Sequence, residues 1–399
     1  MTTSIIHRRD FLKAACTGAA LLAAGCRPGL SEPAGWTKST AAPEDIRMRV
    51  LRIAILAPNP HNAQPWSVVF TGDSGMSLFV DQSRLLPLID PAARQVHIGQ
   101  GAFLELLEMA ARQFGYRATV VYFPDREYSN SVLENRPVAS ISLYPDSRAE
   151  PDPLFAQISR RVSNKARFER NRVISQADAE ALCSAPGTGS RAENDSSQTI
   201  GWWMTQRESE LHALAAMCKG AMAVEASSPE RNRETAEWFR FSAGELAEKR
   251  DGFGIEQSGV TGVREWIAET FLLNRQRAAD PNGSFARGAV NLAGAQASTA
   301  SAFAALIGTA NTRLEQVLIG RAYCRVHLAA ARLGLAMQPL SQLLEEYPEM
   351  DPLQRRLKQM LNISAEQTVQ MLFRLGYAKP TPHTPRRDVR SLIRPGVAS

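Results

Sequence analysis

The sequence predicts an α+β fold in which two consecutive halves of one chain form a single structure. Amphipathic helical patterns alternate with short apolar strand patterns along 399 residues, a length that suits two domains or one large one. Residues 100–115 and 319–334 also form a weak internal repeat, each with small residues first, then an Ala-rich face and a closing glycine. The alternative is that two unrelated buried helices both need small residues where they pack.

Composition and charge are those of an ordinary globular protein. Hydrophobic residues make up 44% of the chain and charged residues 22%, and the net charge is +6. Arg8, Arg9 and Lys13 against Asp10 place part of this charge near the N-terminus. The rest of the chain has no basic stripe with interleaved aromatic residues, so we expect no nucleic-acid partner.

Residues 1–26 resemble a twin-arginine export signal. His7–Lys13 contains the paired arginines, and the weakly apolar run that follows, residues 14–24, is too short to span a bilayer. The resemblance implies export of the folded protein by the twin-arginine machinery to the periplasm. A merely basic, disordered tail is the alternative.

The end of this signal resembles a bacterial lipoprotein cleavage site. In Leu22-Ala23-Ala24-Gly25-Cys26 the cysteine would carry a lipid anchor after processing. Ala23 stands where such sites more often have leucine, so cleavage without a lipid stays open. Residues 27–43 are rich in Gly, Pro, Ser and Thr, which is typical of a flexible linker.

The remaining cysteines predict neither a disulfide framework nor a metal site. Cys183, Cys218 and Cys324 lack Cys-x-x-Cys spacing, and the six histidines show no ligand spacing. Cys218 and Cys324 lie in apolar helical patterns and are therefore expected to be small core residues.

The first half, residues 44–150, is predicted to begin with a helix and a hairpin. Helical apolar spacing covers residues 44–56, and a Gly-containing turn separates strand patterns at 66–70 and 76–81. A 3.6-residue period predicts a helix from Ile98 to a capping glycine at Gly115. Strands at 118–123 and 138–144 complete this half.

The second half, residues 151–399, is predicted to be richer in helix. A joint at residues 144–153, with proline and aspartate at both ends, separates it from the first half. We expect strands near Trp202 and at 302–307. Helices are expected at 175–184, 208–225 and 230–249, around Trp266, and at 314–333, where Gly334 ends the last of them.

A Pro-rich loop, residues 57–66, is the first candidate binding element. Its three prolines remove backbone donors and restrict φ, so the helix before it must end and the loop must be stiff. Hydrogen-bonding side chains beside the Trp66 indole suit a flat heterocycle with polar edges. These side chains are Asn59, His61, Asn62 and Gln64. An ordinary helix-to-strand turn is the alternative.

A basic segment, residues 160–168, is the second candidate. Arg161, Ser163 and Lys165 alternate, so in an extended backbone their side chains project to the same side. Two cations and a hydroxyl on one side would clamp an anion such as a phosphate. A solvated basic strand is the alternative.

Both segments resemble parts of flavin-dependent nitroreductases. Arg161-x-Ser163-x-Lys165 resembles the segment whose arginine and serine hold the FMN phosphate and whose lysine faces the N1/O2 edge of the flavin. Residues 57–66 resemble the Pro-Ser-x-x-Asn-x-Gln-Pro-Trp loop of the same family. The resemblance implies FMN as the cofactor and Lys165 as the residue that stabilises the charge of reduced flavin. It also implies cofactor contacts from Pro58, Asn59, Pro60 and Asn62.

Two segments near the C-terminus extend the resemblance. Residues 334–342 resemble the Gly-Leu-x-x-x-Pro-x-x-Gly segment whose backbone N–H groups meet flavin N5 and O4, which implies contacts from Ser341 and Gln342. Arg374-Leu375-Gly376-Tyr377, followed by Thr384-Pro385-Arg386-Arg387, resembles the family's closing strand and phosphate-binding arginine, which implies that Arg386 and Arg387 hold the phosphate.

The order of the segments is unusual for this family. Ordinary members carry the basic segment before the Pro-rich loop, and they are homodimers in which each flavin contacts the basic segment of one subunit and the loop of the other. A chain with the loop in its first half and the basic segment in its second is expected to be a single-chain pseudo-dimer with one composite site. It would act as a monomer with one FMN. Over residues 45–390 this arrangement resembles the Acg-like branch of the nitroreductase superfamily.

The resemblance implies an FMN-dependent oxidoreductase. It would pass a hydride or electrons through flavin N5 to a small acceptor, a nitro compound or a quinone, and no side-chain acid or base need be invoked for this step. The alternative is a protein that binds or sequesters flavin without turnover. Residues 253–296, with Trp266, Phe271 and Leu272, are expected to cover the flavin as a lid.

Overall fold

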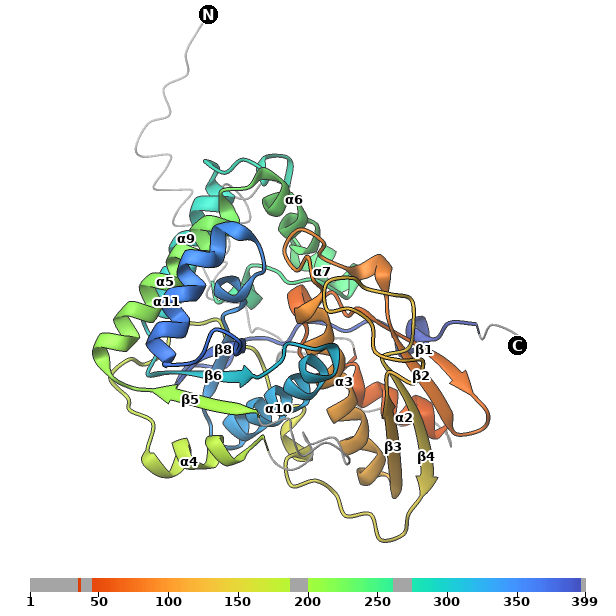
Figure 1. Ribbon diagram of the computed structural model, residues 1–399. Helices are drawn as coiled ribbons and strands as arrows, with labels where there is room; N and C mark the ends of the chain where they lie inside the picture. Colours follow the sequence, from red (N-terminus) through yellow and green to blue (C-terminus); the bar gives the residue numbers. More distant parts are fainter. Residues whose placement is uncertain (1–34, 37–44, 187–199, 261–274, 396–399) are drawn as a thin grey trace, which may run out of the picture. The chain divides into compact units, whose positions relative to one another are not determined.

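The computed structural model describes residues 35–36, 45–186, 200–260 and 275–395, which form two antiparallel four-stranded sheets with helices packed on them (Figure 1). The export signal, and the predicted helix around Trp266 with Phe271 and Leu272, lie outside these ranges. The predicted α+β class is confirmed.

The first sheet belongs entirely to the first half of the chain. Its strand order is β1-β2-β4-β3, and α3 packs against β2 and β3. The elements are α2 (Ile46–Ala54), η1 (Pro60–Asn62), β1 (Trp66–Thr71), β2 (Gly75–Val80), η2 (Gln82–Arg84), α3 (Arg94–Gln113), β3 (Tyr116–Tyr122) and β4 (Ala139–Pro145). Asp45 caps α2 by accepting a hydrogen bond from the Arg47 backbone N–H, and Gly115, with φ of +77°, follows the end of α3 as predicted.

The second sheet belongs entirely to the second half and has the order β5-β6-β8-β7. Its elements are η3 (Phe155–Gln157), α4 (Gln176–Ser184), β5 (Gly201–Thr205), α5 (Glu208–Ala226), α6 (Pro229–Trp238), α7 (Ala243–Lys249), η5 (Glu256–Ser258), η7 (Arg275–Arg277), α9 (Ser284–Ala297), β6 (Ala302–Gly308), α10 (Arg313–Arg332), β7 (Ala336–Pro339), η8 (Ser341–Leu344), η9 (Pro348–Met350), α11 (Asp351–Leu361), β8 (Thr368–Gly376) and η10 (Val389–Leu392).

The two halves share one topology. In each, two strands precede a long helix and two follow it, and the strand directly after the helix takes the sheet edge while the last strand inserts beside the second. The helices in question are α3 and α10, which hold the two copies of the weak sequence repeat. In the second half, α5 to α9 are inserted between the first two strands. The arrangement as two tandem halves is confirmed.

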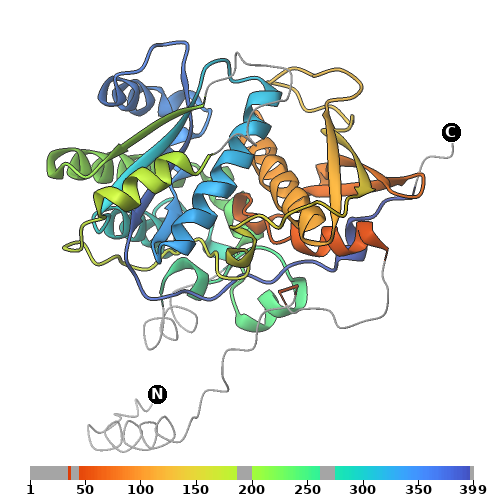
Figure 2. The same ribbon diagram turned by 90° about the horizontal axis from the view of Figure 1, so that it is seen from below.

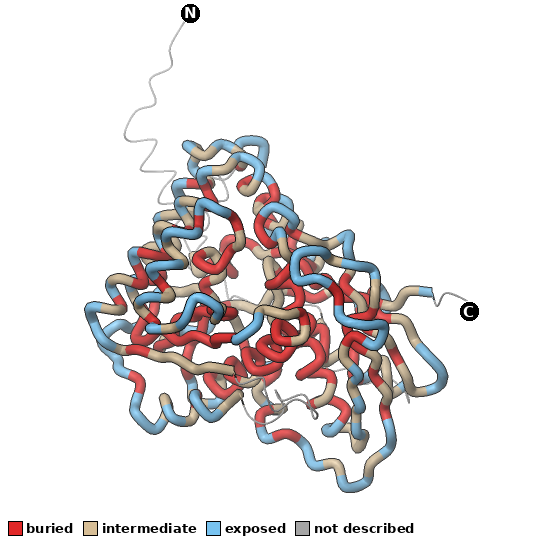
Figure 3. The backbone as a smooth tube through the Cα atoms, in the orientation of Figure 1, coloured by how far each residue is buried: buried red, intermediate tan, exposed pale blue. Residues whose placement is uncertain are grey.

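Helices α3 and α10 cross at the centre of the structure, where the residues are among the most buried (Figures 2 and 3). They meet through Gly101 and Gly320, the second residues of the two repeat copies. A Cβ atom added to Gly101 would lie 1.8 Å from the Val317 carbonyl oxygen, and one added to Gly320 would lie 1.9 Å from that of Ile98. The contact is symmetric, because each glycine faces the residue that lies three positions before the glycine of the opposite helix.

The C-terminal segment passes from the second sheet to the first (Figure 2). Ile393 forms a parallel bridge with Val68, and the Arg394 backbone N–H donates to the Val68 carbonyl oxygen at 2.8 Å. This return brings residues 382–387 beside the Pro-rich loop of the first half.

Several predicted boundaries were wrong. The helix predicted at 230–249 is two helices, because α6 ends at Trp238 and α7 starts after the N-cap Ser242. Helix α3 starts at Arg94 rather than Ile98, after Ala93 in a left-handed conformation that no typical capping residue signals. Helices α9 and α11 were not predicted.

The described ranges show neither of two further features, a membrane-spanning helix and a metal-binding cluster. None of the helices there combines the length and apolar character that a membrane crossing requires. Likewise, those ranges contain no group of three or more His, Cys, Asp or Glu side chains placed to hold a metal. Cys218 and Cys324 are buried free thiols, as their apolar patterns predicted.

Candidate functional site

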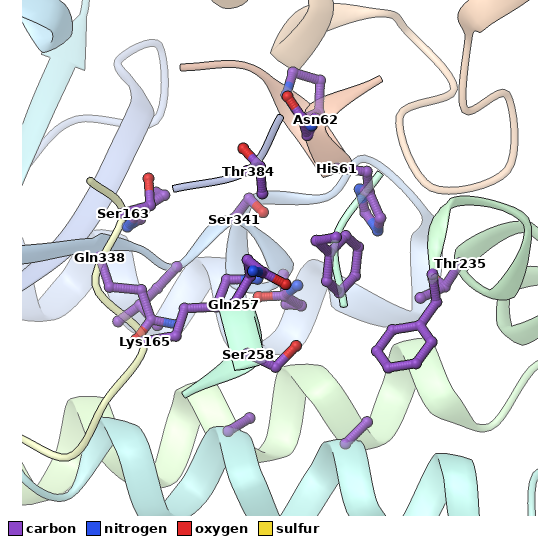
Figure 4. A pocket seen from close by; sticks show the side chains of 18 of the residues that line it. His61, Asn62, Ser163, Lys165, Thr235, Gln257, Ser258, Gln338, Ser341 and Thr384 are labelled. Carbon is purple, nitrogen blue, oxygen red and sulfur yellow. The ribbon is translucent and has the colours of Figure 1, made fainter. Parts of the chain in front are cut away.

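A cavity of about 660 Å³ is lined by residues of both halves (Figure 4). Its volume is in the range of cofactor sites. Every predicted cofactor residue except Arg387 lines it: Pro58, Asn59, Pro60, Asn62, Arg161, Ser163, Lys165, Ser341, Gln342 and Arg386. Figure 4 shows Ser163 and Thr384 at one end and Thr235 at the opposite end.

The Pro-rich loop is held in place by its own polar side chains. Asn59 Oδ1 accepts from the Gln64 backbone N–H at 2.7 Å, and the Asn62 amide donates to the carbonyl oxygens of Gly252 at 2.9 Å and Pro385 at 3.1 Å. His61, Asn62 and Gln64 have positive φ, a conformation that these contacts stabilise. The amides that the sequence offered to a ligand are therefore largely used within the protein.

The aromatic wall of the cavity differs from the one expected. Trp66 is fully buried in the core, 5.0 Å from the Phe103 ring, and does not line the cavity. Phe253 lines it instead, with its ring 5.4 Å from His61 and 4.4 Å from Lys165 Nζ. Phe239 and Phe285 extend this wall. Phe253 and Phe285 belong to residues 253–296, the segment expected to cover the flavin, whereas Phe239, just after α6, was not singled out from the sequence.

Arg161 and Arg386 form a buried cationic pair at the end near Thr384. Each is only 3% exposed. Arg161 donates to the Leu56 carbonyl oxygen at 2.8 Å, and Arg386 donates to that of Ile55 at 2.8 Å and to Asn62 Oδ1 at 2.7 Å. The two carbonyl groups follow the C-terminal end of α2, where the helix dipole favours cations.

This pair has no carboxylate partner in the part of the chain that the structure describes. Burial lowers the pKa of Arg161, and burial followed by the charge of Arg161 lowers the pKa of Arg386 to about 9. Burial and then both arginines also lower the pKa of His383 to about 4, so this histidine adds no charge at neutral pH. Arg161 Nε is buried without a hydrogen-bond partner among the described residues. The donor set therefore fits an anion such as phosphate.

Lys165 stands farther along the same wall. The Asn164 backbone N–H donates to the Met337 carbonyl oxygen at 2.9 Å, and Ser163 bridges to Met337, so the basic segment is extended beside β7. The predicted alternation thus places Arg161, Ser163 and Lys165 on the cavity. Burial lowers the pKa of Lys165 to about 8, and the charge of Glu225 opposes this shift.

Arg387 lies away from the cavity lining. Its backbone N–H donates to Gln64 Oε1 at 2.9 Å, and its guanidinium donates to the Gln64 carbonyl oxygen at 3.0 Å and lies 3.5 Å from an Asp81 carboxylate oxygen. Arg387 therefore fastens the C-terminal segment to the Pro-rich loop.

Trp36 lines the cavity although it falls in the predicted linker. Its ring packs 3.9 Å from that of His383, and its Nε1 donates to the Thr384 carbonyl oxygen at 2.9 Å. Gly35 approaches Arg386 so closely, with φ of +94°, that only glycine fits. A tryptophan within a Gly- and Pro-rich linker was the available signal for this contact.

The comparisons with known sequences point to proteins named as nitroreductases. No family model matches the chain. The acg protein of Mycobacterium tuberculosis, provisionally named an NAD(P)H nitroreductase, is 33% identical over 86 residues, which cover 22% of this chain and only about a quarter (26%) of the relative. A second M. tuberculosis protein with the same provisional name is 25% identical over 351 residues, covering 86% of this chain and 90% of the relative. At this coverage the similarity extends over both halves of the chain, and the predicted nitroreductase-like α+β fold is confirmed.

The solved structures found in the comparison carry similar names. A protein provisionally called a nitroreductase, from Anabaena variabilis, is 11% identical, covers 85% of this chain and 90% of its own, and has a TM-score of 0.48. The FMN-dependent nitroreductase NfnB from Mycobacterium smegmatis, solved with NADPH, is 15% identical, covers 60% of this chain and 96% of its own, and has a TM-score of 0.36.

Proposed function

We propose that this chain is an FMN-dependent oxidoreductase of the nitroreductase superfamily, in its Acg-like branch, with one composite site that holds one FMN. The observation that carries the proposal is the buried pair Arg161 and Arg386, which lines the cavity without a carboxylate partner among the described residues. A buried charge is costly unless it is paired, so an anionic ligand would compensate both arginines. The FMN phosphate supplies such a charge.

The other lining residues then take roles along the cofactor. Ser163 and Thr384 lie near the arginines and would bind the phosphate with them. Lys165 would stabilise negative charge on the reduced ring system, and backbone groups of Ser341 and Gln342 would contact its reactive edge. FMN when bound supplies the two-electron redox chemistry, whereas the protein supplies position, electrostatics and exclusion of water.

Anaerobic absorbance measurements would test this function. We expect the purified yellow protein to contain one FMN per chain, because the loop and the basic segment each occur once. NADH, NADPH or a quinol should bleach it, and a quinone or nitroaromatic compound should restore the colour. Two flavins per chain would overturn the composite site. Bleaching by dithionite alone, with no acceptor restoring the colour, would favour the sequestering alternative.

We also propose that the protein is exported by the twin-arginine route to the periplasm, with Cys26 either lipidated or removed with the signal. The support is the sequence around Arg8 and Arg9. The variant Arg8→Lys with Arg9→Lys should stay in the cytoplasm, measured by fractionation and immunoblotting. Arg27→Lys, the same chemical change after the cleavage site, should be exported normally. Labelling with palmitate would distinguish an anchored from a free product, and normal export of the paired variant would refute the signal.

A further inference from the structure

Glu225, near the C-terminal end of α5, is a buried carboxyl group that lines the cavity at the end opposite the arginine pair. It is 5% exposed. Thr235 Oγ1 donates to its Oε1 at 3.3 Å, and Thr235 marks the far end of the cavity from Ser163 and Thr384 in Figure 4. The Gln342 side chain approaches the same carboxyl group. Oε2 has no hydrogen-bond partner among the described residues.

We propose that Glu225 is the proton donor for the acceptor in this site, an inference that rests on the proposed function. The cofactor phosphate would occupy the cationic end of the cavity, so the acceptor would be reduced toward the other end. There the Phe239 and Phe253 rings and the Glu225 carboxyl group line the cavity together. A flat apolar acceptor would thus pack on aromatic rings with a single acidic hydrogen beside it.

The surroundings of Glu225 favour the neutral, proton-carrying form. Burial raises its pKa to about 7, although hydrogen bonding from Thr235 and Gln342 opposes the shift. The charged and titratable groups around it are Lys165, Arg231, Glu234, Glu345 and Tyr347. Glu345 is also buried, with its pKa raised well above the ordinary value by burial and then by the charge of Glu225. Two buried carboxyl groups repel each other when both are ionised, so the pair tends to keep one of them protonated.

The proton transfer balances with a quinone as the acceptor. Reduced FMN, if bound here, would supply a hydride, which is two electrons and one proton. A quinone that accepted the hydride would then be a hydroquinone anion in need of one more proton. The O–H bond of Glu225 breaks, the proton binds the anionic oxygen, and the bonding electron pair stays on the carboxylate. The positive charge of the Lys165 ammonium then stabilises the new Glu225 carboxylate. Water returns a proton to Glu225 after the hydroquinone leaves.

Reoxidation kinetics would test this role with two acceptors. Reduced wild-type protein and Glu225→Gln are mixed anaerobically with benzoquinone, which needs a proton, or with ferricyanide, which takes electrons alone. We expect Glu225→Gln to lower the benzoquinone rate at least tenfold relative to the ferricyanide rate. The wild-type benzoquinone rate should fall as pH rises through about 7, as Glu225 loses its proton, and the variant should lack this fall.

Glu234→Gln is the matched control. Glu234 is a buried carboxylate on the adjacent α6, it accepts from the Leu88 and Ile89 backbone N–H groups, and it does not line the cavity. This variant should keep the wild-type ratio of the two rates. If Glu225→Gln fails to fold, Glu225→Asp keeps a carboxyl group and should retain a pH-dependent benzoquinone rate. An unchanged rate ratio and an unchanged pH profile in Glu225→Gln would refute the role of Glu225 but leave the proposed function standing. Wild-type protein that is neither reduced nor reoxidised would refute both the proposed function and the role of Glu225.

The melting temperature of the flavin-free protein gives a readout independent of turnover. Because folding raises the pKa of Glu225 from its ordinary 4.5 to about 7, the unfolded chain releases this proton at lower pH than the native protein. The carboxyl group therefore lowers native stability as pH rises between these values. We expect Glu225→Gln to melt at the wild-type temperature at pH 4 and at a higher temperature at pH 8. Equal melting temperatures at pH 8 would contradict a buried, proton-retaining carboxyl group.

Discussion

Gly320→Ala is expected to destabilise the protein by about 3 kcal/mol or more, a large share of the ~5–15 kcal/mol that holds a typical domain folded. The added methyl group would lie 1.9 Å from the Ile98 carbonyl oxygen and 3.0 Å from Gly101 Cα. Both atoms belong to the backbone of α3, so no side chain can move aside and the helices must separate. Separation would open the buried interface between the two halves. Urea or thermal unfolding would measure the loss.

Gly101→Ala should show nearly the same loss, since its methyl group would meet the Val317 carbonyl oxygen at 1.8 Å. The double variant should cost less than the sum of the two, because either change alone already forces the same helices apart. Gly220→Ala in α5 is the control: its methyl group would find Leu353 at an ordinary 3.7 Å, so we expect wild-type stability or a gain of up to ~1 kcal/mol. Wild-type unfolding of Gly320→Ala would contradict the close helix crossing.

The parts of the fold that the sequence predicted well are those with local causes. Helical periodicity and a closing glycine at Gly115 and Gly334 identified α3 and α10, and a glycine-rich turn identified the first hairpin. Their start points and the break after Trp238 depend on tertiary contacts that no local pattern reveals. The two sheets have the same strand order, which indicates that the weak sequence repeat belongs to two halves of the same fold.

The residues of the candidate site were likewise predictable only where their arrangement has a local cause in the sequence. Arg161, Ser163 and Lys165 are close in sequence, so their alternation could be read directly, and the structure places all three on the cavity. Trp66 was predicted to form a wall of the site but lies in the core, because the loop sequence does not indicate which side of it faces the cavity. Glu225 lies in an ordinary helical pattern, and only burial beside Thr235 and Gln342 distinguishes it from a solvated carboxylate.

Arg161→Met is expected to weaken FMN binding about 10- to 100-fold while leaving riboflavin binding nearly unchanged. A charge-assisted hydrogen bond is worth ~1.5–3 kcal/mol, and riboflavin lacks the phosphate that would receive it. The flavin-free variant should be at least as stable as wild type, because methionine fills a similar volume and removes a buried cation without a carboxylate partner in the described residues. The Leu56 carbonyl oxygen would keep a donor in Arg386, at 3.3 Å.

Isothermal titration of both ligands into flavin-free protein measures these affinities, with Lys165→Met as the matched control. That variant also removes a cation of the basic segment from the cavity wall, but its expected partner is the ring system that FMN and riboflavin share. It should therefore weaken both ligands by the same factor and keep their ratio, whereas Arg161→Met should bring the ratio of FMN to riboflavin affinity close to one. If Arg161→Met preserved the wild-type preference for FMN, the buried arginine pair would serve only to hold the chain after α2, and the phosphate would have to bind elsewhere.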